Sequence, residues 1–223
     1  MTTPEVKQSV IWLMLASLIG FLITAVFSMG LRWDRSLFLV PYITIIGIFF
    51  VIYFSKQPIS LRQLLGPWRM GLVGVAVATL FLMWKVQGYP PSAVPEGIQL
   101  VWAIIWIGIT YGMVDGLLLN VMPVLIVHRA WPDEADTSRT TLLTRGFLAL
   151  LASIFVTIAY HLGYTEFHGF SMFWVIIGNS IITLTYLLTG SPLSAIVTHV
   201  IMHIAAVLHG METVLMLPPH YAI

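Results

Sequence analysis

The sequence has no cysteine and little charge, and both absences narrow what the protein can be. Without cysteine, disulfide bonds, thiolate catalysis and Cys-ligated metal sites are excluded. Charged residues make up only 9% of the 223 residues, whereas a soluble domain carries about 25%, so a water-soluble fold is excluded as well. The formal net charge is +1, and the Lys and Arg residues form no cluster, which excludes nucleic acid as an expected partner.

Long apolar runs fill almost the whole chain. Hydrophobic residues account for 59% of the sequence, and the mean hydropathy is +0.95. A transmembrane helix needs about 20 predominantly apolar residues, and seven segments meet or approach this length: 10–29, 37–54, 70–86, 97–127, 142–162, 170–188 and 193–217. We therefore predict an all-α fold, a polytopic membrane helix bundle with about seven transmembrane helices in one domain, residues 1–223. Residues 10–86 would form three N-terminal spans, and residues 97–217 a four-helix core that carries the polar site.

The distribution of Lys and Arg predicts how the bundle is oriented. Across seven spans, one side receives Lys7, Lys56, Arg62, Arg69, Arg129, Arg139 and Arg145, and the other side receives Arg32, Arg35 and Lys85. Because cytoplasmic loops carry the excess of positive charge, we expect an integral protein of the plasma membrane with a cytoplasmic N-terminus. The first apolar run is long and no small-residue cleavage site follows it, so we expect an anchor and not a signal peptide. The lipid bilayer is then an immediate partner.

Ionisable side chains are rare within the predicted spans, and each is a candidate site residue. A charged group near the middle of the bilayer costs about 2.5 to 3.5 kcal/mol on insertion scales. The candidates are Asp115 in the fourth span, His161 in the fifth, and His199 and His203 in the seventh. His209 and Glu212 are weaker candidates, because they lie nearer the outer surface.

Glycines and polar residues recur at four-residue intervals along the spans that carry these candidates or lie next to them. Gly108, Gly112 and Gly116 form a strip on the fourth span that predicts close approach of another helix. Tyr111 lies one turn before Asp115 and could donate a hydrogen bond to the carboxylate. Further polar strips are Ser153, Thr157 and His161 on the fifth span, Asn179 and Thr183 on the sixth, and Ser194, Thr198, His199 and His203 on the seventh. We expect these four helices to turn their polar strips toward one another.

A carboxylate and several imidazoles in a dry pocket suit two kinds of chemistry. They can activate water by general base action, or they can hold a metal ion that does so. Histidines four residues apart on a helix can reach the same ion, so His161, His199 and His203 are candidate ligands of zinc, another divalent metal or haem. The alternative is that these side chains only tie helices together through hydrogen bonds, each worth about 0.6 kcal/mol on average.

Several signatures of membrane enzymes are missing. His199 is followed by Val200 and Ile201, so there is no His-Glu-x-x-His zinc motif. Gly178-Asn179-Ser180 is followed by Ile181, so there is no Gly-x-Ser-Gly motif. An aspartyl mechanism needs two intramembrane carboxylates that share a proton, and Asp115 lies alone. The His-x-x-His-His boxes of membrane desaturases are absent too. Serine-type and aspartyl-type proteolysis are therefore disfavoured.

Three segments carry a family resemblance. The turn Thr189-Gly190-Ser191-Pro192 leads into a helix with His199 and His203, Phe155 precedes His161-Leu162-Gly163, and Asp115-Gly116-Leu117-Leu118-Leu119-Asn120 lies upstream. These segments resemble, in turn, the His-x-x-x-Asn, Phe-x-x-x-His and Glu-Glu-x-x-x-Arg motifs of the CPBP family, the intramembrane CAAX-processing and bacteriocin-processing proteases also called the Abi family. The resemblance covers about the last half of the chain. Asp115, Gly116, Asn120 and His203 stand where the family has Glu, Glu, Arg and Asn.

The resemblance implies an intramembrane peptidase that hydrolyses a peptide bond within or near the membrane, with a peptide or membrane protein as its substrate. By position, Asp115 and His161 would activate water, while His199 and His203 would stabilise the oxyanion or hold a metal. We expect Tyr111, Asn120, Thr157 and Asn179 to support these residues. Two other hypotheses stay open: a catalytically inactive membrane scaffold or binding protein, and a membrane protein that holds a metal or haem through its histidines.

Overall fold

The computed structural model describes residues 3–131, 138–212 and 216–217, and this part of the chain contains helices and no β-strand. The α-helices are α1 (Thr3–Ile23), α2 (Arg35–Lys56), α3 (Leu61–Leu65), α4 (Trp68–Gln87), α5 (Gly97–Ala103), α6 (Gly112–Asp115), α7 (Met122–Ala130), α8 (Arg139–His161), α9 (Phe170–Thr189) and α10 (Pro192–His209). Three π-helical segments, η1 (Thr24–Gly30), η2 (Ile104–Tyr111) and η3 (Gly116–Val121), and one 3-10 turn, η4 (Thr165–Phe167), complete them. The all-α prediction is confirmed.

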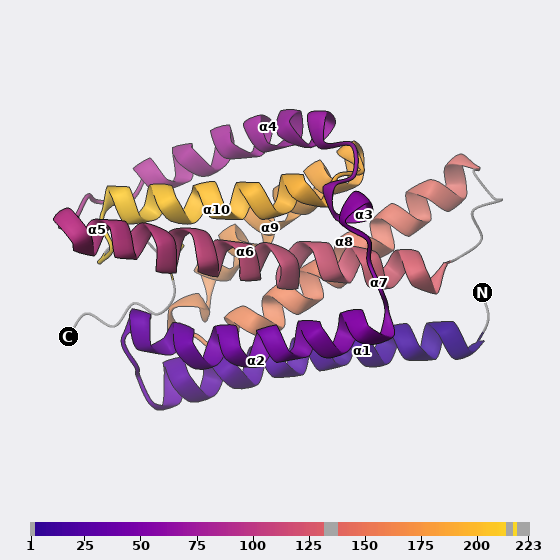
Figure 1. The fold of residues 1–223 in the computed structure, drawn as a ribbon, viewed down its shortest axis with the longest axis horizontal. Helices are drawn as coiled ribbons and strands as arrows, with labels where there is room; N and C mark the ends of the chain where they lie inside the picture. Colours follow the sequence, from indigo (N-terminus) through magenta and orange to yellow (C-terminus); the bar gives the residue numbers. More distant parts are fainter. Residues whose placement is uncertain (1–2, 132–137, 213–215, 218–223) are drawn as a thin grey trace.

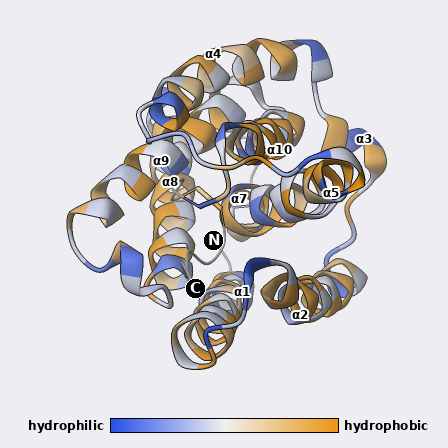
Figure 2. Cartoon of the chain, turned by 90° about the vertical axis from the view of Figure 1, so that its left-hand side faces the viewer, coloured by the Kyte–Doolittle hydropathy of each residue, from blue (hydrophilic) through white to orange (hydrophobic). Residues whose placement is uncertain are grey.

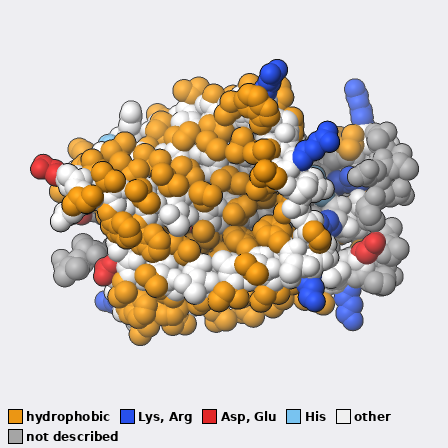
Figure 3. Space-filling view, in the orientation of Figure 1, with side chains coloured by type: hydrophobic (Ala, Val, Ile, Leu, Met, Phe, Trp, Pro, Cys, Tyr) orange, Lys and Arg blue, Asp and Glu red, His pale blue; other side chains and the backbone are white. Residues whose placement is uncertain are grey.

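Seven helices of the described chain are long and apolar enough to cross a membrane, as the sequence predicted. They are Glu5–Gly30, Arg35–Lys56, Leu61–Gln87, Gly97–Ala130, Arg139–His161, Phe170–Thr189 and Pro192–His209. Hydrophobic side chains cover the middle of the face seen in Figure 3, and Lys and Arg side chains gather toward one end. Apolar residues also lie on the outward faces of the helices in the end-on view of Figure 2. The protein is therefore an integral membrane protein.

The fourth span forms the centre of the bundle (Figure 1). It is one continuous helix from α5 to α7, between the pair α1 and α2 on one side and the pair α4 and α10 on the other. α10 packs against α4 and against η2, α6 and η3 of this central helix, and α8 packs against α1, α7 and α9. The span has 34 residues, and at about 1.5 Å per residue it exceeds the hydrocarbon thickness of about 30 Å. It must therefore tilt or project.

The glycine strip of the central helix brings α10 into close contact. A Cβ atom added to Gly112 would lie 2.8 Å from Cα of Val200, and one added to Gly116 would lie 2.8 Å from Cα of Ile196. No larger residue fits without moving the backbone of α10. The predicted close approach is confirmed, and it fixes the distance between the helix that carries Asp115 and the helix that carries two of the candidate histidines.

Asp115 occupies a special place in the central helix. It closes α6, a single ordinary turn between the π-helical segments η2, which ends at Tyr111, and η3, which begins at Gly116. π-Helical turns are rare and occur frequently at functional sites. Gly108, Gly112 and Gly116 nevertheless keep their four-residue spacing through these segments, against Ile204, Val200 and Ile196 of α10.

Two helix ends decide whether His161 can meet the histidines of α10. α8 ends at His161, and the chain then folds inward through η4, with Tyr164 and Phe167 buried. α10 ends at His209, before Gly210 at φ +127°, so the predicted span 193–217 was too long. Figure 1 shows that α8 begins well beyond the level at which α10 begins, and the end of α8 therefore returns to the depth of the middle of α10.

Candidate active site

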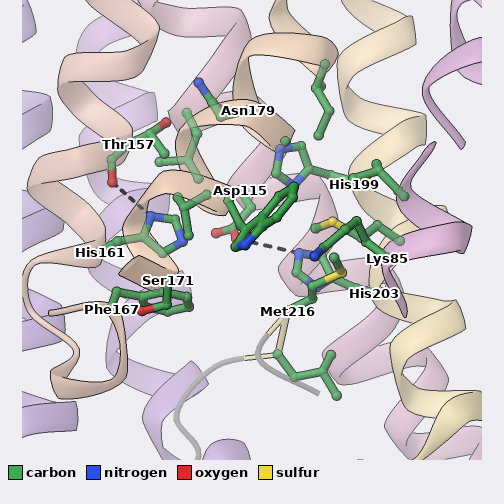
Figure 4. Close-up of a pocket in the computed structure, with 18 of the residues that line it drawn as sticks. Lys85, Asp115, Thr157, His161, Phe167, Ser171, Asn179, His199, His203 and Met216 are labelled. Atoms are coloured by element: carbon green, nitrogen blue, oxygen red, sulfur yellow. Dashed lines mark hydrogen bonds and ion pairs between the residues drawn. The ribbon is translucent and has the colours of Figure 1, made fainter. Parts of the chain in front are cut away.

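All four candidate residues line one cavity inside the bundle, of about 140 Å³. Figure 4 shows Asp115 between His161 on one side and His199 and His203 on the other. The cavity lining also includes Tyr111, Thr157 and Asn179, three of the four predicted supporting residues. The fourth, Asn120, is fully buried and contacts His199. The expectation that four helices turn their polar strips toward one another is confirmed.

The carboxylate of Asp115 is 3% exposed and has two near neighbours. Its Oδ1 accepts a hydrogen bond from the hydroxyl of Tyr42 on α2, and its Oδ2 lies 3.6 Å from Nε2 of His203. The predicted partner, Tyr111, instead shares a 2.9 Å hydrogen bond with the hydroxyl of Tyr160. Tyr111 stays close to the site through its ring, whose centroid is 4.6 Å from that of His203.

His199 is held in one tautomer by Asn120. Nε2 of His199 lies 2.7 Å from Oδ1 of Asn120. The amide nitrogen of Asn120 donates to Oδ1 of Asn179 and to Oγ1 of Thr183, at 2.9 and 2.8 Å, so its oxygen can only accept. The proton is therefore on Nε2 of His199. Its Nδ1 carries a lone pair, is buried and has no hydrogen-bond partner among the described residues.

The side chains of Asn120, Asn179 and Ser153 form a hydrogen-bonded network next to His199, and the donor of each bond along this chain can be assigned. Nδ2 of Asn179 donates to Oγ of Ser153 at 2.9 Å, and Ser153 donates to the carbonyl oxygen of Leu119 at 2.6 Å. A backbone carbonyl can only accept, so the direction of every bond from Leu119 back to Asn120 follows from it. This network explains why Asn120 is buried in a membrane span, and it gives Asn179 a structural role.

His203 is the least satisfied group in the cavity. It is 2% exposed, and neither ring nitrogen has a hydrogen-bond partner within the described structure. At 3.6 Å, the separation between its Nε2 and Oδ2 of Asp115 is too long for a hydrogen bond. Buried polar groups are nearly always paired in proteins, so an orphaned imidazole needs an explanation.

His161, on the other side of the cavity, is held through its other ring nitrogen, Nδ1, whereas His199 is held through Nε2. Its Nδ1 lies 2.8 Å from the carbonyl oxygen of Thr157, one turn earlier on α8. Because that oxygen can only accept, Nδ1 carries the proton and Nε2 carries a lone pair. Phe167 lies edge-on to the ring, with centroids 4.7 Å apart, and holds its orientation. His161 is thus a neutral imidazole whose free nitrogen is available as a base.

A possible metal-ligand group differs from the set predicted from sequence. Asp115, His199 and His203 each offer a ligand atom, and these atoms all lie within 4.8 Å of one another. His161 does not belong to this group, because it stands on the opposite wall of the cavity. The carboxylate takes the place that the sequence had given to the third histidine.

Three tyrosines at the site, Tyr42, Tyr160 and Tyr164, were not predicted from the sequence. Tyr42 contacts Asp115, and the hydroxyl of Tyr160 lies 2.7 Å from that of Tyr164. Tyr164 follows the fifth span, and burial raises the pKa of its hydroxyl well above the usual value, so it stays a neutral hydrogen-bonding group. Tyr42 lies inside the predicted span 37–54, and this position was the signal that the sequence offered, because membrane tyrosines otherwise gather at the interfaces.

Apolar side chains form most of the cavity wall, and Lys85 adds the one cation among the lining residues. The apolar residues include Phe81, Leu82, Trp174, Ile182 and Met202. Nζ of Lys85 lies 3.7 Å from the centroid of the Trp174 ring. The weaker candidates lie elsewhere: Nε2 of His209 bonds the carbonyl oxygen of Tyr89, and Glu212 is exposed.

The chain was also compared with known proteins. No family model, no curated protein and no solved structure matches it.

Proposed function

We propose that this protein is a divergent CPBP-type intramembrane peptidase that hydrolyses a peptide bond within or near the membrane. One observation carries the proposal: a neutral imidazole with a free Nε2, His161, faces a buried carboxylate, Asp115, across a cavity inside the membrane-spanning bundle. A fixed base beside an acid, in a site that can hold water and a substrate, is what hydrolysis requires.

The chemistry assigns a separate task to each wall of the cavity. Nε2 of His161 takes a proton from water as the water oxygen attacks the carbonyl carbon of the scissile bond. The negative charge of Asp115 stabilises the imidazolium that forms, and His161 then returns the proton to the leaving nitrogen as the C–N bond breaks. Thr157 supports the base through its carbonyl oxygen, and its Oγ1, which has no partner among the described residues, can donate to the substrate carbonyl.

The shape and polarity of the cavity favour a membrane-embedded substrate. Most of its wall surface is apolar and surrounds the polar groups, as expected for a site that accepts a hydrophobic peptide segment. We propose that the substrate is a peptide or membrane protein in the surrounding bilayer. Seven of the ten Lys and Arg residues belong to one end of the bundle, which supports placing that end and the N-terminus in the cytoplasm of a plasma membrane.

Cleavage by reconstituted protein tests the proposal. The full chain is placed in proteoliposomes with a library of fluorogenic peptides that carry a transmembrane segment. We expect His161→Gln and Asp115→Asn each to lower kcat/KM by about 100- to 10,000-fold, the range for loss of a general acid–base group. His128→Gln is the matched control, since His128 lies at the far end of α7 and does not line the cavity.

Two results would count against a peptidase. Equal cleavage by the wild type, His161→Gln and Asp115→Asn would remove both residues from catalysis. If no member of the library is cleaved while Asp115→Ala leaves the cellular phenotype unchanged, the protein is a catalytically silent scaffold or binding protein. In both cases, size-exclusion chromatography and thermal unfolding confirm that the variants remain folded.

A further inference from the structure

We propose that Asp115, His199 and His203 bind one divalent metal ion of the zinc type. Each of the three side chains is at least 95% buried, and each offers a ligand atom within 4.8 Å of the others. Two imidazoles and one carboxylate are a common protein ligand set for zinc in hydrolytic enzymes. The proposal deepens the proposed function because it concerns the same cavity, but metal binding can be measured without any cleavage.

The first argument is that each of the three groups can offer the others a lone pair. Asn120 fixes the proton of His199 on Nε2, which leaves an unpartnered lone pair on Nδ1, and Asp115 is a carboxylate. In neutral His203 one ring nitrogen offers a lone pair and the other carries a proton, and neither has a hydrogen-bond partner among the described residues. Acceptors that converge in a dry, apolar surrounding repel one another, since little solvent is present to screen them. A cation between them removes the repulsion.

The second argument is the separation of the ligand atoms. Oδ2 of Asp115 and Nε2 of His203 are 3.6 Å apart, beyond the range of a hydrogen bond. Zinc binds oxygen and nitrogen ligands at about 2.0 to 2.1 Å in tetrahedral geometry, which sets neighbouring ligand atoms about 3.4 Å apart. The spacing of this pair is therefore close to the edge of a zinc tetrahedron, and the three ligand atoms all lie within 4.8 Å of one another.

The third argument is that two of the three ligands, His199 and Asp115, have an outer partner. A metal-bound histidine usually donates its other ring nitrogen to a fixed acceptor, and bound carboxylates accept further hydrogen bonds. Asn120 serves His199 in this way, and Tyr42 serves Oδ1 of Asp115, leaving Oδ2 toward the histidine. These contacts come from α2 and from the amide network, so the orientation of these two ligands is built into the fold.

The remaining coordination position would face the cavity. Catalytic zinc sites use three protein ligands and keep the fourth position for water or substrate. Bound there, zinc supplies a Lewis acid that lowers the pKa of water and polarises a carbonyl. His161 stands on the opposite wall with a free Nε2, outside the ligand group. His203, which stands where the CPBP pattern has Asn, completes the set.

Metal analysis of the purified chain tests the inference. The full-length protein, carrying no polyhistidine tag, is loaded with ZnCl₂ in detergent micelles, and loosely bound metal is removed. We expect about one zinc per chain in the wild type and in His161→Gln, and loss of stoichiometric zinc in Asp115→Asn and His203→Asn. Asn120→Ala keeps all three ligands, and its zinc affinity should fall about 10- to 100-fold. Competition with a chromophoric chelator measures these affinities.

The two proposals fail in different ways. A folded wild type that takes up no zinc overturns the metal site. Equal zinc in the wild type, Asp115→Asn and His203→Asn also overturns it, because the metal is then an adventitious ion only. Cleavage that depends on His161 but persists without metal leaves the peptidase in place, whereas stoichiometric zinc without cleavage leaves only the metal site.

Discussion

The bundle holds two buried polar clusters that lie next to each other and differ in one respect. The amide cluster, formed by Asn120, Ser153, Asn179 and Thr183, makes its hydrogen bonds within itself, to backbone carbonyls and, through Oδ1 of Asn120, to His199. The cavity cluster is formed by Asp115, His161, His199 and His203. Four of its ring nitrogens have no hydrogen-bond partner among the described residues: Nε2 of His161, Nδ1 of His199 and both nitrogens of His203. Both clusters draw on the central helix.

The difference separates structural polarity from functional polarity inside a membrane. A polar side chain in a span is costly, and the cost is removed when its hydrogen bonds are made. The amide cluster has made them, so it needs no further explanation. The cavity cluster has not made all of its hydrogen bonds, so its unpartnered nitrogens can bind a proton, a metal or a substrate. Substitutions should therefore lower function in the cavity cluster and stability in the amide cluster, except at Asn120, which bonds His199 and should affect both.

Outside the acid–base residues, the largest effect is expected where the central helix and α10 meet, at Gly112. In Gly112→Ala the new Cβ would lie 2.8 Å from Cα of Val200, so α10 must move away by roughly 1 Å, and displacements of this size can cost about 100-fold in rate. Peptide cleavage and zinc affinity in reconstituted protein measure the loss. The matched control is Gly146→Ala, because nothing lies within 4 Å of that position. Undiminished cleavage in Gly112→Ala would contradict the requirement for close packing.

A smaller functional effect is expected at Tyr42, which orients the carboxylate. Tyr42→Phe removes one hydrogen bond to Asp115 and keeps the ring that packs on Phe38 and Tyr160. Hydrogen bonds to charged groups are worth about 1.5 to 3 kcal/mol, so kcat/KM should fall about 10- to 100-fold while the thermal unfolding midpoint changes little. Tyr53→Phe is the comparison, because Tyr53 bonds Arg129 at the other end of the bundle. An equal loss in both variants would argue against an orienting role.

The sequence predicted the helices and most members of the cavity cluster, because apolar length and four-residue spacing suffice for both. Seven spans, the contact of the glycine strip and the meeting of Asp115 with His161, His199 and His203 were all anticipated. Spacing tells which residues share a face, but not how far each helix is rotated or shifted along the membrane. How deep His161 lies in the bundle depends on the level at which α8 begins relative to α10, and residue spacing does not predict that level.

The details that sequence missed arise from contacts between distant segments. Asp115 accepts a hydrogen bond from Tyr42 on α2, whereas Tyr111, the neighbour expected from spacing, bonds Tyr160 on α8. The helix end at His209 follows from Gly210 and from bonds to the loop after α4, residues 89–92. Lys85, near the end of α4, lines the cavity and lies over the ring of Trp174 from α9, a contact between distant segments that spacing does not predict.

The amide cluster should respond in stability and not in function. Ser153→Ala removes the donor to Leu119 and the acceptor for Asn179, and interhelical hydrogen bonds in membranes contribute about 0.6 to 1.7 kcal/mol. The free energy of unfolding in detergent should fall by that amount, while kcat/KM stays within a few-fold of the wild type. A loss of cleavage much greater than the loss of stability would mean that the amide cluster takes part in catalysis.

The smallest effect has the opposite sign and concerns His203. In metal-free protein this imidazole is buried with no hydrogen-bond partner among the described residues, so His203→Leu exchanges an unsatisfied polar group for an apolar one. Such a change should raise the free energy of unfolding by up to about 1 kcal/mol, although zinc binding is abolished. Unfolding with and without excess chelator measures it. Zinc should stabilise the wild type and leave His203→Leu unaffected. If the variant is instead less stable than metal-free wild type, His203 makes a stabilising contact, and the contrast between the clusters does not hold at this residue.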